Sequence, residues 1–428
     1  MVPGTVNTED GAVPTSEAGA KPRSLLRNRD FMLLWSGQVV SDLGSSISGI
    51  AFPLLVLLLS NNSAEAAGTA AALARLPYLF FSLPAGAFID RWDRKRVMIV
   101  CDSGRALSLA TIPLAMAFNA LTIWQLFAVA FVEGTFYVFF NLAEVAAIPR
   151  VVPKAQLPAA TAQTSAAGGT VGLIGPGIGG LIYERLGAVV PFVVDAFSYG
   201  ASVVSLIFLK TNFKREPSTV QRHLGREIRE GVSWLWQQPL IRFMAFVTGI
   251  LNFVFSASTL IVIIAAKEMG GSADDIGLIF GIGAIGGIIG SIIGGRIQKR
   301  FSFGQAIIGI IWFQAILFPL YAVAPHLLVL GAISALLFLG GPVYNVVQYS
   351  YRLALIPDEL QGRVNSSFRL LAFGFQPLGA FIGGILLERF GVVTTVMFFS
   401  AWMFAISILT TLNSHVRDAP PLESETAA

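Results

Sequence analysis

The chain has 428 residues, of which 54% are hydrophobic and only 13% are charged. Soluble domains carry about 25% charged residues, so a chain this apolar is expected to hold most of its surface in lipid. One cysteine excludes an internal disulfide, three scattered histidines provide no metal site, and a net charge of +4 does not indicate nucleic-acid binding, because the basic residues gather at the ends of apolar segments.

Twelve apolar segments are long enough to cross the core of a bilayer, which takes about 20 residues in a helix. The polar residues on either side of them, 1–30 and 413–428, predict two disordered tails. Composition and spans together predict an all-α integral membrane protein with twelve transmembrane helices. In chain order the segments are 31–60, 66–89, 97–118, 122–147, 164–184, 188–209, 242–266, 274–297, 304–323, 327–349, 365–387 and 392–412.

The basic residues are spread unevenly over the connections between these segments. On the side that holds both ends of the chain there are 24 Lys and Arg, against three on the other side, Arg185, Lys267 and Arg389. Short loops rich in Lys and Arg stay in the cytoplasm. The even number of spans therefore predicts that both termini are cytoplasmic.

The chain contains an internal repeat. The sequence of residues 179–187, Gly-Gly-Leu-Ile-Tyr-Glu-Arg-Leu-Gly, returns at 383–391 as Gly-Gly-Ile-Leu-Leu-Glu-Arg-Phe-Gly. Duplicated six-helix halves with a substrate site between them are a known plan of transporters. We therefore predict two six-helix bundles, 31–209 and 242–412.

The linker between the halves, 210–241, has its own pattern. Leu224, Ile228, Val232 and Leu235 follow helical spacing, and arginines take the other faces. This predicts an amphipathic helix on the anionic cytoplasmic lipid surface. It serves either as a plain tether or as a regulatory element.

Ionisable residues inside membrane spans are costly and usually functional. The predicted spans of the second half carry almost none at depth, so we infer that the first half handles charge and the second offers a mostly apolar wall. The residues concerned are Asp42, Arg75, Asp102, Arg105, Glu133, Glu144 and Asp195, with Glu144 nearest the cytoplasmic end.

Asp42 lies about 17 Å into its span, at 1.5 Å per residue. Desolvation at that depth disfavours the charged form of a carboxyl group, which suits a proton carrier. The alternative is a structural ion pair with Arg75 on the neighbouring span. Asp102 and Arg105 lie three residues apart on one helix face, which predicts an ion pair within that helix.

Two other carboxylates have different expected roles. Glu133 lies next to Gly134 at mid-depth without an evident partner, which favours a functional role. Asp195 is either a carboxylate of the site or a group that reaches water on the outer side of the membrane.

The connection between the second and third spans combines glycine with carboxylates and cations. Gly86, Asp90, Arg91, Arg94 and Lys95 follow the order Gly-x-x-x-Asp-Arg-x-x-Arg-Lys. This order resembles the signature loop of the major facilitator superfamily. The resemblance implies a gate, in which Asp90 and Arg91 help a charge network to hold the cytoplasmic side closed and Arg94 and Lys95 form its basic end. The matching loop of the second half has Gln298 in place of Asp90, so the lock would be one-sided.

A second motif lies in the fifth span. Gly175, Pro176, Gly179 and Gly180 resemble the fifth-helix motif of antiporters in this superfamily, which implies export in exchange for protons. Glycines at this spacing, here and in the span 274–297, also predict close helix crossings.

Three further features resemble the branch that contains macrolide-efflux proteins and enterobactin exporters. They are the two Ile/Val-Pro pairs at 148–153, the run from Asp195 to Tyr199 and the amphipathic linker. We therefore expect proton-driven export of a bulky amphipathic molecule, such as a drug or a secondary metabolite, by alternating access. The alternatives are a siderophore or lysolipid exporter, or a membrane scaffold or sensor that transports nothing.

The expected setting follows from the same features. The partners would be a small-molecule substrate, protons and membrane lipids, without nucleic acid, cofactor or metal, in a monomer. Its place would be a cytoplasmic membrane of the bacterial type. The sequence shows no pair of a nucleophile and a base and no set of metal ligands that would indicate an enzyme.

Overall fold

The computed structural model describes residues 25–89, 92–211, 213, 224–357 and 360–419. These residues form helices and connections, and no strand occurs among them. The predicted tails lie largely outside the described residues. Of their described parts, 25–27 and 414–417 form two short helices, η1 (Leu25–Arg27) and α14 (Ser414–Arg417).

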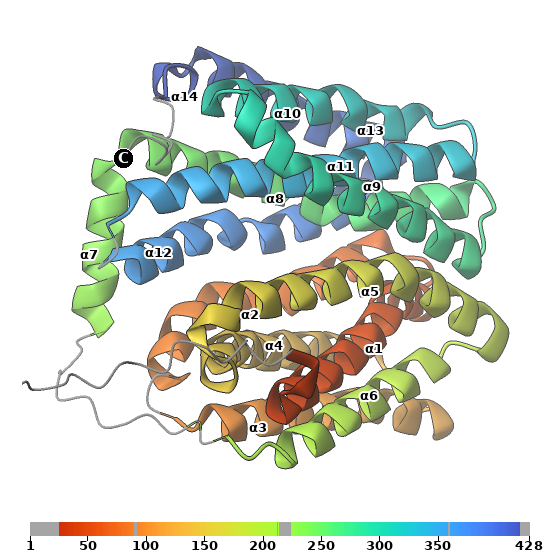
Figure 1. Ribbon diagram of the computed structural model, residues 1–428. Coiled ribbons are helices and arrows are strands. Elements are labelled where there is room, and N and C mark those ends of the chain that lie inside the picture. The colour runs from red at the N-terminus through yellow and green to blue at the C-terminus, as the bar shows by residue number, and fades with distance from the viewer. Residues whose placement is uncertain (1–24, 90–91, 212, 214–223, 358–359, 420–428) are drawn as a thin grey trace, which may run out of the picture.

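The first six long helices form one bundle, drawn in red to green in Figure 1. Within it α1 packs on α5 and α6, α2 packs on α4, and α3 packs on α4 and α6. The helices are α1 (Arg29–Leu59), α2 (Ala64–Ile89), α3 (Arg94–Ala117), α4 (Ile123–Val151), α5 (Leu157–Leu186, after the short η2, Lys154–Gln156) and α6 (Val190–Ile207).

The second bundle contains the helices after the linker, drawn in green to blue (Figure 1). Here α9 packs on α11, α13 packs on α8, and α10 packs on α11 and α13. The helices are α8 (Pro239–Glu268), α9 (Ala273–Arg300), α10 (Phe303–Leu317, continued by η3, Phe318–Val323), α11 (Leu327–Leu355), α12 (Gln361–Gly374) and α13 (Gln376–Leu412).

Eleven helical segments of the described chain are long and apolar enough to cross a membrane. The last of them covers 52 residues, 361–412, which at 1.5 Å per residue would run about 78 Å, more than twice the thickness of a bilayer core. Gly391 divides it, because its φ of 73° and ψ of −178° lie outside the helical region. The structure is thus compatible with the twelve predicted spans.

Side-chain caps fix where several helices begin. Asp93 accepts hydrogen bonds from the backbone N–H groups of Lys95 and Arg96 at the start of α3. Ser272 and Ser302 form capping boxes at the starts of α9 and α10. Such caps satisfy N–H groups that have no partner inside the helix.

The sequence repeat has a structural counterpart at its last glycine. Gly187 ends α5 with φ 93°, and Gly391, the same position of the repeat, divides α13 with φ 73°. Residues with a side chain rarely adopt this left-handed region, so glycine is required at both ends.

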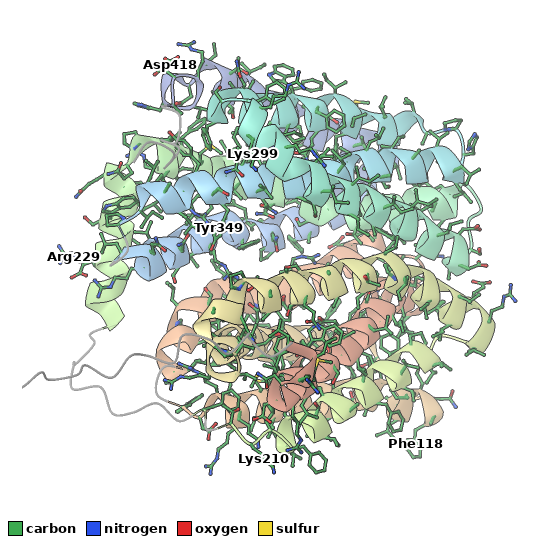
Figure 2. The ribbon with its side chains drawn as sticks, viewed as in Figure 1. Phe118, Lys210, Arg229, Lys299, Tyr349 and Asp418 are labelled. Atoms are coloured by element: carbon green, nitrogen blue, oxygen red, sulfur yellow. The ribbon has the colours of Figure 1, made fainter. Side chains whose placement is uncertain are left out.

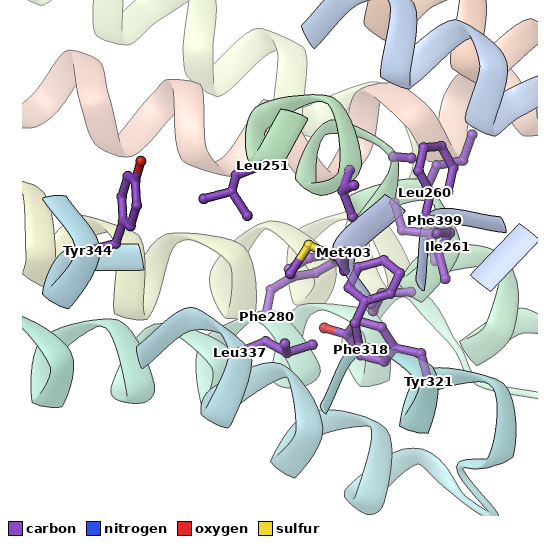
Figure 3. Packing of buried hydrophobic residues seen from close by; sticks show 14 of the residues in the cluster. Leu251, Leu260, Ile261, Phe280, Phe318, Tyr321, Leu337, Tyr344, Phe399 and Met403 are labelled. Carbon is purple, nitrogen blue, oxygen red and sulfur yellow. The ribbon is translucent and has the colours of Figure 1, made fainter. Parts of the chain in front are cut away.

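The second bundle has an extensive apolar core. Leu260, Phe318, Leu337, Phe399 and Met403 pack there among side chains from α8 to α13 (Figure 3). On the outside of both bundles large apolar side chains are exposed, as Leu107 of α3 and Leu328 of α11 show with 71% and 66% exposure. This distribution fits a surface surrounded by lipid.

The linker helix α7 (Leu224–Gln237) lies across the ends of the other helices and packs on α12 (Figure 1). Arg229 on α7 and Phe118 after α3 lie at opposite ends of the molecule (Figure 2). We call the end with α7 and α14 the terminal face and the end with Phe118 the opposite face. The predicted helix in the linker is therefore present.

The packing of α7 is only partly that of a helix on a lipid surface. Leu235 is buried against protein, Val232 is exposed, and the side chains of Leu224 and Ile228 lie outside the described part. Glu230 forms an ion pair with Arg363 of α12 at 2.5 Å. The linker helix is thus fastened to the second bundle.

The two bundles meet at two crossings near the opposite face, α5 with α9 and α2 with α13. A Cβ at Gly180 would collide with the backbone carbonyl of Ala273, and one at Gly384 would collide with that of Ala64. The predicted close crossings of glycine-rich helices are therefore present, and they bring helices of different bundles together.

Candidate functional site

A cavity of about 260 Å³ lies between the two bundles, directly on the terminal side of these crossings. Side chains of α1, α2, α3, α4 and α6 form one wall, and α8 and α13 form the other. The first wall includes Arg75, Arg105, Glu133 and Asp195, whereas Leu260 and Ile263 belong to the second. The second wall also contains the uncharged Ser256 and Thr259, so all ionisable residues that line the cavity within the described part belong to the first half.

Arg105 on α3 is the centre of the charged wall. Its Nε lies 3.1 Å from Glu133 Oε2 on α4, and its Nη1 lies 3.9 Å from Asp102 Oδ1 one turn earlier. Its guanidinium carbon lies 4.1 Å from the ring centre of Tyr199 on α6. The predicted pair between Asp102 and Arg105 is present, but it is the longer of the two ion pairs.

Glu133, for which the sequence showed no evident partner, has two in the structure. Besides Arg105, it accepts a hydrogen bond from Ser108 Oγ at 2.7 Å. Because α3 and α4 pack side by side, a serine and an arginine of α3 both reach this carboxylate.

Asp195 does not reach water, so that alternative is wrong. It is 1% exposed and accepts hydrogen bonds from Ser48 Oγ on α1 at 2.5 Å and from Ser198 Oγ at 3.2 Å. The neighbouring Tyr199 hydroxyl lies 2.8 Å from Ser45 Oγ. Serines of α1 therefore hold both polar groups of α6 at the cavity.

Asp42 and Arg75 do not form the pair considered above. Asp42 accepts from Gln38 Nε2 at 3.4 Å, and Arg75 Nη1 donates to the carbonyl of Ala71 at 3.0 Å. Asp42 is exposed and lies seven residues, two helical turns, before Gly49, so both lie on the helix face that lines the cavity. Asp42 is thus placed between the charged wall and the terminal face.

Several polar members of the site were not predicted from the sequence. Ser45, Ser48, Ser108 and Tyr199 hold the charged groups by hydrogen bonds or ring contact. In the sequence, these residues could have been found only by their spacing. Each lies one or two helical turns from a buried ionisable residue or on the same helix face as Asp42.

The second bundle is also not wholly apolar. Arg352, assigned to a connection from the sequence, belongs to α11 and is buried, with its guanidinium carbon 3.8 Å from the ring centre of Phe368. It lies in the last turns of α11 near the terminal face, away from the residues that line the cavity.

The predicted gating loop is described in part. Asp90 and Arg91 lie outside the described residues. Arg94 donates to the carbonyl of Ala146 near the end of α4 at 2.8 Å. Lys95 Nζ donates to the carbonyls of Ile207 and Leu209 at the end of α6, at 2.9 and 2.7 Å. Cations are favoured at helix C-termini, so the basic end of the loop ties α3 to two neighbours.

The glycines of the fifth-helix motif face two different partners. Gly175 and Gly179 lie against Ser46 and Ile47 of α1, and Gly180 lies against Ala273 of α9. Pro176 lies inside the helix between them. The motif therefore brings α5 close to a helix of its own bundle and to a helix of the other.

The arrangement has an excess of acidic groups. Asp102 and Glu133 pair with the guanidinium of Arg105, and Asp195, held by Ser48 and Ser198, belongs to the same wall of the cavity. Neither oxygen of the fully buried Asp102 accepts a hydrogen bond from the described residues. No group of three His, Cys, Asp or Glu in the described part has the geometry of a metal site.

The model of the family described as Major Facilitator Superfamily matches residues 34–375. The chain belongs to the Major Facilitator Superfamily. This match covers the first bundle, the linker and the second bundle up to the start of α13. The fold is therefore that of a multi-pass membrane transporter.

Two curated relatives are similar to nearly the whole chain. The multidrug efflux pump Tap of Mycolicibacterium fortuitum is 26% identical over 399 residues, which cover 91% of this chain and 96% of that protein. Macrolide efflux protein A of Streptococcus pyogenes is 24% identical over 398 residues, which cover 90% and 96%. The expected resemblance to the macrolide-efflux branch is thereby confirmed.

Solved structures of two transport proteins share the fold. The nucleoside transporter NupG aligns with a TM-score of 0.73 at 13% identity, covering 88% of this chain and 98% of that one. A bacterial homologue of the iron transporter ferroportin, in its inward-facing state, aligns with 0.67 at 15% identity, covering 90% and 100%. At these identities the likeness concerns the fold alone.

Proposed function

We propose that this protein exports a bulky amphipathic molecule, such as a drug or a secondary metabolite, in exchange for protons. Its similarity to a multidrug efflux pump and to a macrolide efflux protein, over nine tenths of the chain, supports export. The mixed walls of the cavity support an amphipathic substrate, since one side offers charge and the other Leu260 and Ile263.

The observation that carries the proton coupling is the charge balance around Arg105. Asp102 and Glu133 pair with the one guanidinium of Arg105, and the third carboxyl group, that of Asp195, is 1% exposed on the same wall. If all three were ionised, two negative charges would remain without compensation, which is costly at low dielectric constant. Binding protons removes that cost, so this cluster is our candidate for the coupled proton site.

Asp42 is the candidate for proton entry and exit. It is exposed on the cavity face of α1, one turn nearer the terminal face than Ser45. A carboxylate in that place relays protons between the Arg105 cluster and water on the terminal side.

The wider architecture belongs to the same proposal. The chain divides into bundles 31–209 and 242–412 joined by the linker 210–241, and works as a monomer by alternating access. It lies in the cytoplasmic membrane with the terminal face inside, as the distribution of Lys and Arg predicts. Asp90 and Arg91 close the cytoplasmic side when the opposite face opens.

Transport into proteoliposomes with an imposed pH gradient tests the coupling. Erythromycin, rhodamine 123 and the carboxylate dye rhodamine 110 are the probes, and exchange without a gradient is measured beside net uptake. We expect Glu133→Gln to lower gradient-driven uptake at least tenfold while exchange persists, because the amide keeps hydrogen-bonding capacity but carries no proton. Asp42→Asn should slow gradient-driven uptake and leave exchange intact.

Glu65→Gln is the matched control, since Glu65 is an acid at the opposite face outside the charged wall. Gradient-driven uptake at the wild-type rate in both Glu133→Gln and Asp42→Asn would contradict the proton assignment. Absence of any flux in the wild type would favour a scaffold or sensor.

A further inference from the structure

Among the described residues that line the cavity, Arg75 is the one cation that forms no ion pair with the charged cluster. It lies on α2 and is partly buried. Its described hydrogen bond goes from Nη1 to Ala71, a carbonyl of its own helix, and no carboxylate of the described residues lies within 4 Å. A guanidinium has five N–H donors in a planar fork, so most of its donors remain available.

We propose that Arg75 binds an anionic oxygen, a carboxylate or phenolate, of the exported molecule. This inference rests on the proposed export function and narrows its substrate class. The contrast with Arg105 supports it, because Arg105 has two acidic partners and an aromatic ring. Arg75 alone can form a two-pronged contact with an acidic group that enters the cavity.

The surroundings of Arg75 leave space for such a group. The neighbouring positions of α2 that line the cavity, Ala70, Ala71 and Ala74, all carry a single methyl group. Across the cavity, Leu260 and Ile263 of α8 offer an apolar surface to the body of the molecule. The substrate class is therefore an amphipath with an acidic oxygen at one end.

A matched pair of dyes tests this assignment. Rhodamine 110 has a free carboxylate, and rhodamine 123 is its methyl ester, so the two differ at the group that Arg75 would recognise. Binding is measured by fluorescence polarisation on protein in detergent, and transport is measured in proteoliposomes. We expect the wild type to bind rhodamine 110 at least tenfold more tightly, Arg75→Gln to remove that preference and Arg75→Lys to retain part of it.

The outcomes separate this inference from the proposed function. Equal binding of the two dyes by the wild type, or a preference that Arg75→Gln leaves unchanged, overturns the role of Arg75 even if both dyes are exported. A preference that depends on Arg75, without transport of either dye, supports the binding site and contradicts export. Arg300→Gln, at an exposed position at the end of α9, is the control for loss of a positive charge.

A second inference comes from the two crossings at the opposite face. Glu184, on α5, accepts a hydrogen bond from the backbone N–H of Ala273, the first residue of α9, at 3.1 Å. Glu388, on α13, accepts from the N–H of Ala64, the first residue of α2, at 2.6 Å. Each bundle thus contributes a carboxylate that caps a helix of the other.

These contacts are copies of one another in the sequence repeat. Glu184 and Glu388 occupy the same position of the nine-residue repeat, 204 residues apart. The capped helices also begin alike, with Ser-Ala-Glu-Ala-Ala-Gly at 63–68 and Ser-Ala-Asp-Asp-Ile-Gly at 272–277. A carboxylate at a helix N-terminus is stabilised by free N–H groups and the helix dipole.

We propose that Glu184 and Glu388 form a twofold latch that holds the opposite face closed and must release for the substrate to leave. Because Gly180 and Gly384 lie one turn from the two carboxylates, the bundles are close enough for both caps to form together. When the latch releases, the helix N-termini and the two carboxylates become hydrated by water. The latch can therefore open without separating apolar side chains of a core.

Labelling from outside tests the latch. In a Cys101→Ser background, Ala71→Cys on the cavity wall is treated with a membrane-impermeant maleimide in right-side-out vesicles. We expect Glu184→Gln with Glu388→Gln to raise the labelling rate at least fivefold, and either single change to raise it less. Glu→Asp at both positions keeps the negative charge but shortens the side chain. The carboxylate then no longer reaches the other bundle, so the labelling rate should rise here too.

The control is Glu65→Gln, an acid near the same crossing whose side chain makes no described hydrogen bond to the other bundle. Labelling of the double variants at the rate of this control overturns the latch. Thermal unfolding in detergent checks that the variants are folded. Loss of the latch should change the labelling rate without lowering the melting temperature of either bundle.

Discussion

Arg105 shows how one residue can organise a buried site. It is 8% exposed, and two carboxylates from α3 and α4 and a tyrosine ring from α6 surround it. The ring offers the negative face of its π-system to the guanidinium, which is worth about 2 kcal/mol where water is excluded. The arginine therefore fixes three helices of the first bundle to each other.

Tyr199 allows the ring and the hydroxyl to be separated. Tyr199→Phe keeps the ring under Arg105 and removes only the contact with Ser45, so we expect a loss of roughly 1 kcal/mol in stability. Tyr199→Leu also removes the cation–π contact and should cost a further 1–2 kcal/mol. Thermal unfolding in detergent measures both, and equal melting temperatures for the two variants would contradict a role for the ring.

At the scale of elements, the repeat explains which helix ends require glycine. Gly187 and Gly391 have φ of 93° and 73°, and they follow Glu184 and Glu388 by three residues. The residue with the positive φ ends the regular helix three residues, less than one turn, after the capping carboxylate. This places the carboxylate at the last turn, where it can reach the other bundle.

Substitution by alanine tests this requirement. Gly187→Ala forces a side chain into the left-handed region, which costs about 1–2 kcal/mol. Gly200 is the matched control, because it lies inside α6 with open space where a Cβ would be. Gly200→Ala should be neutral or stabilising by up to about 1 kcal/mol, since alanine favours helix more than glycine does. Melting temperatures that fall equally in both variants would contradict the assignment.

At the scale of the whole molecule, the position of the cavity follows from where the bundles touch. The crossings of α5 with α9 and of α2 with α13 close the opposite face, and the cavity begins next to them on their terminal side. On the other side of the cavity Asp42 and Tyr137 are exposed. The helix crossings thus close the opposite face, as alternating access requires of one state. On the terminal side the bundles still touch where Tyr78 of α2 packs edge to face on Phe373 of α12.

Much of this architecture could be predicted from the sequence, because lipid imposes strong constraints. A helix that crosses a bilayer needs a long apolar segment, so the spans were visible as composition. The repeat around Glu184 and Glu388 showed that there are two halves. Ionisable residues such as Arg105 and Glu133 stood out because charge is rare inside spans.

The tertiary structure alone decided which of these groups meet. Arg105 pairs more closely with Glu133 than with Asp102, Asp42 does not pair with Arg75, and Asp195 is held by serines of α1. The sequence determines the period and depth of a residue on its own helix, but contacts between helices depend on how each is rotated and which neighbours it meets. That rotation is set by packing, above all at glycines such as Gly180 and Gly384, where two backbones approach each other.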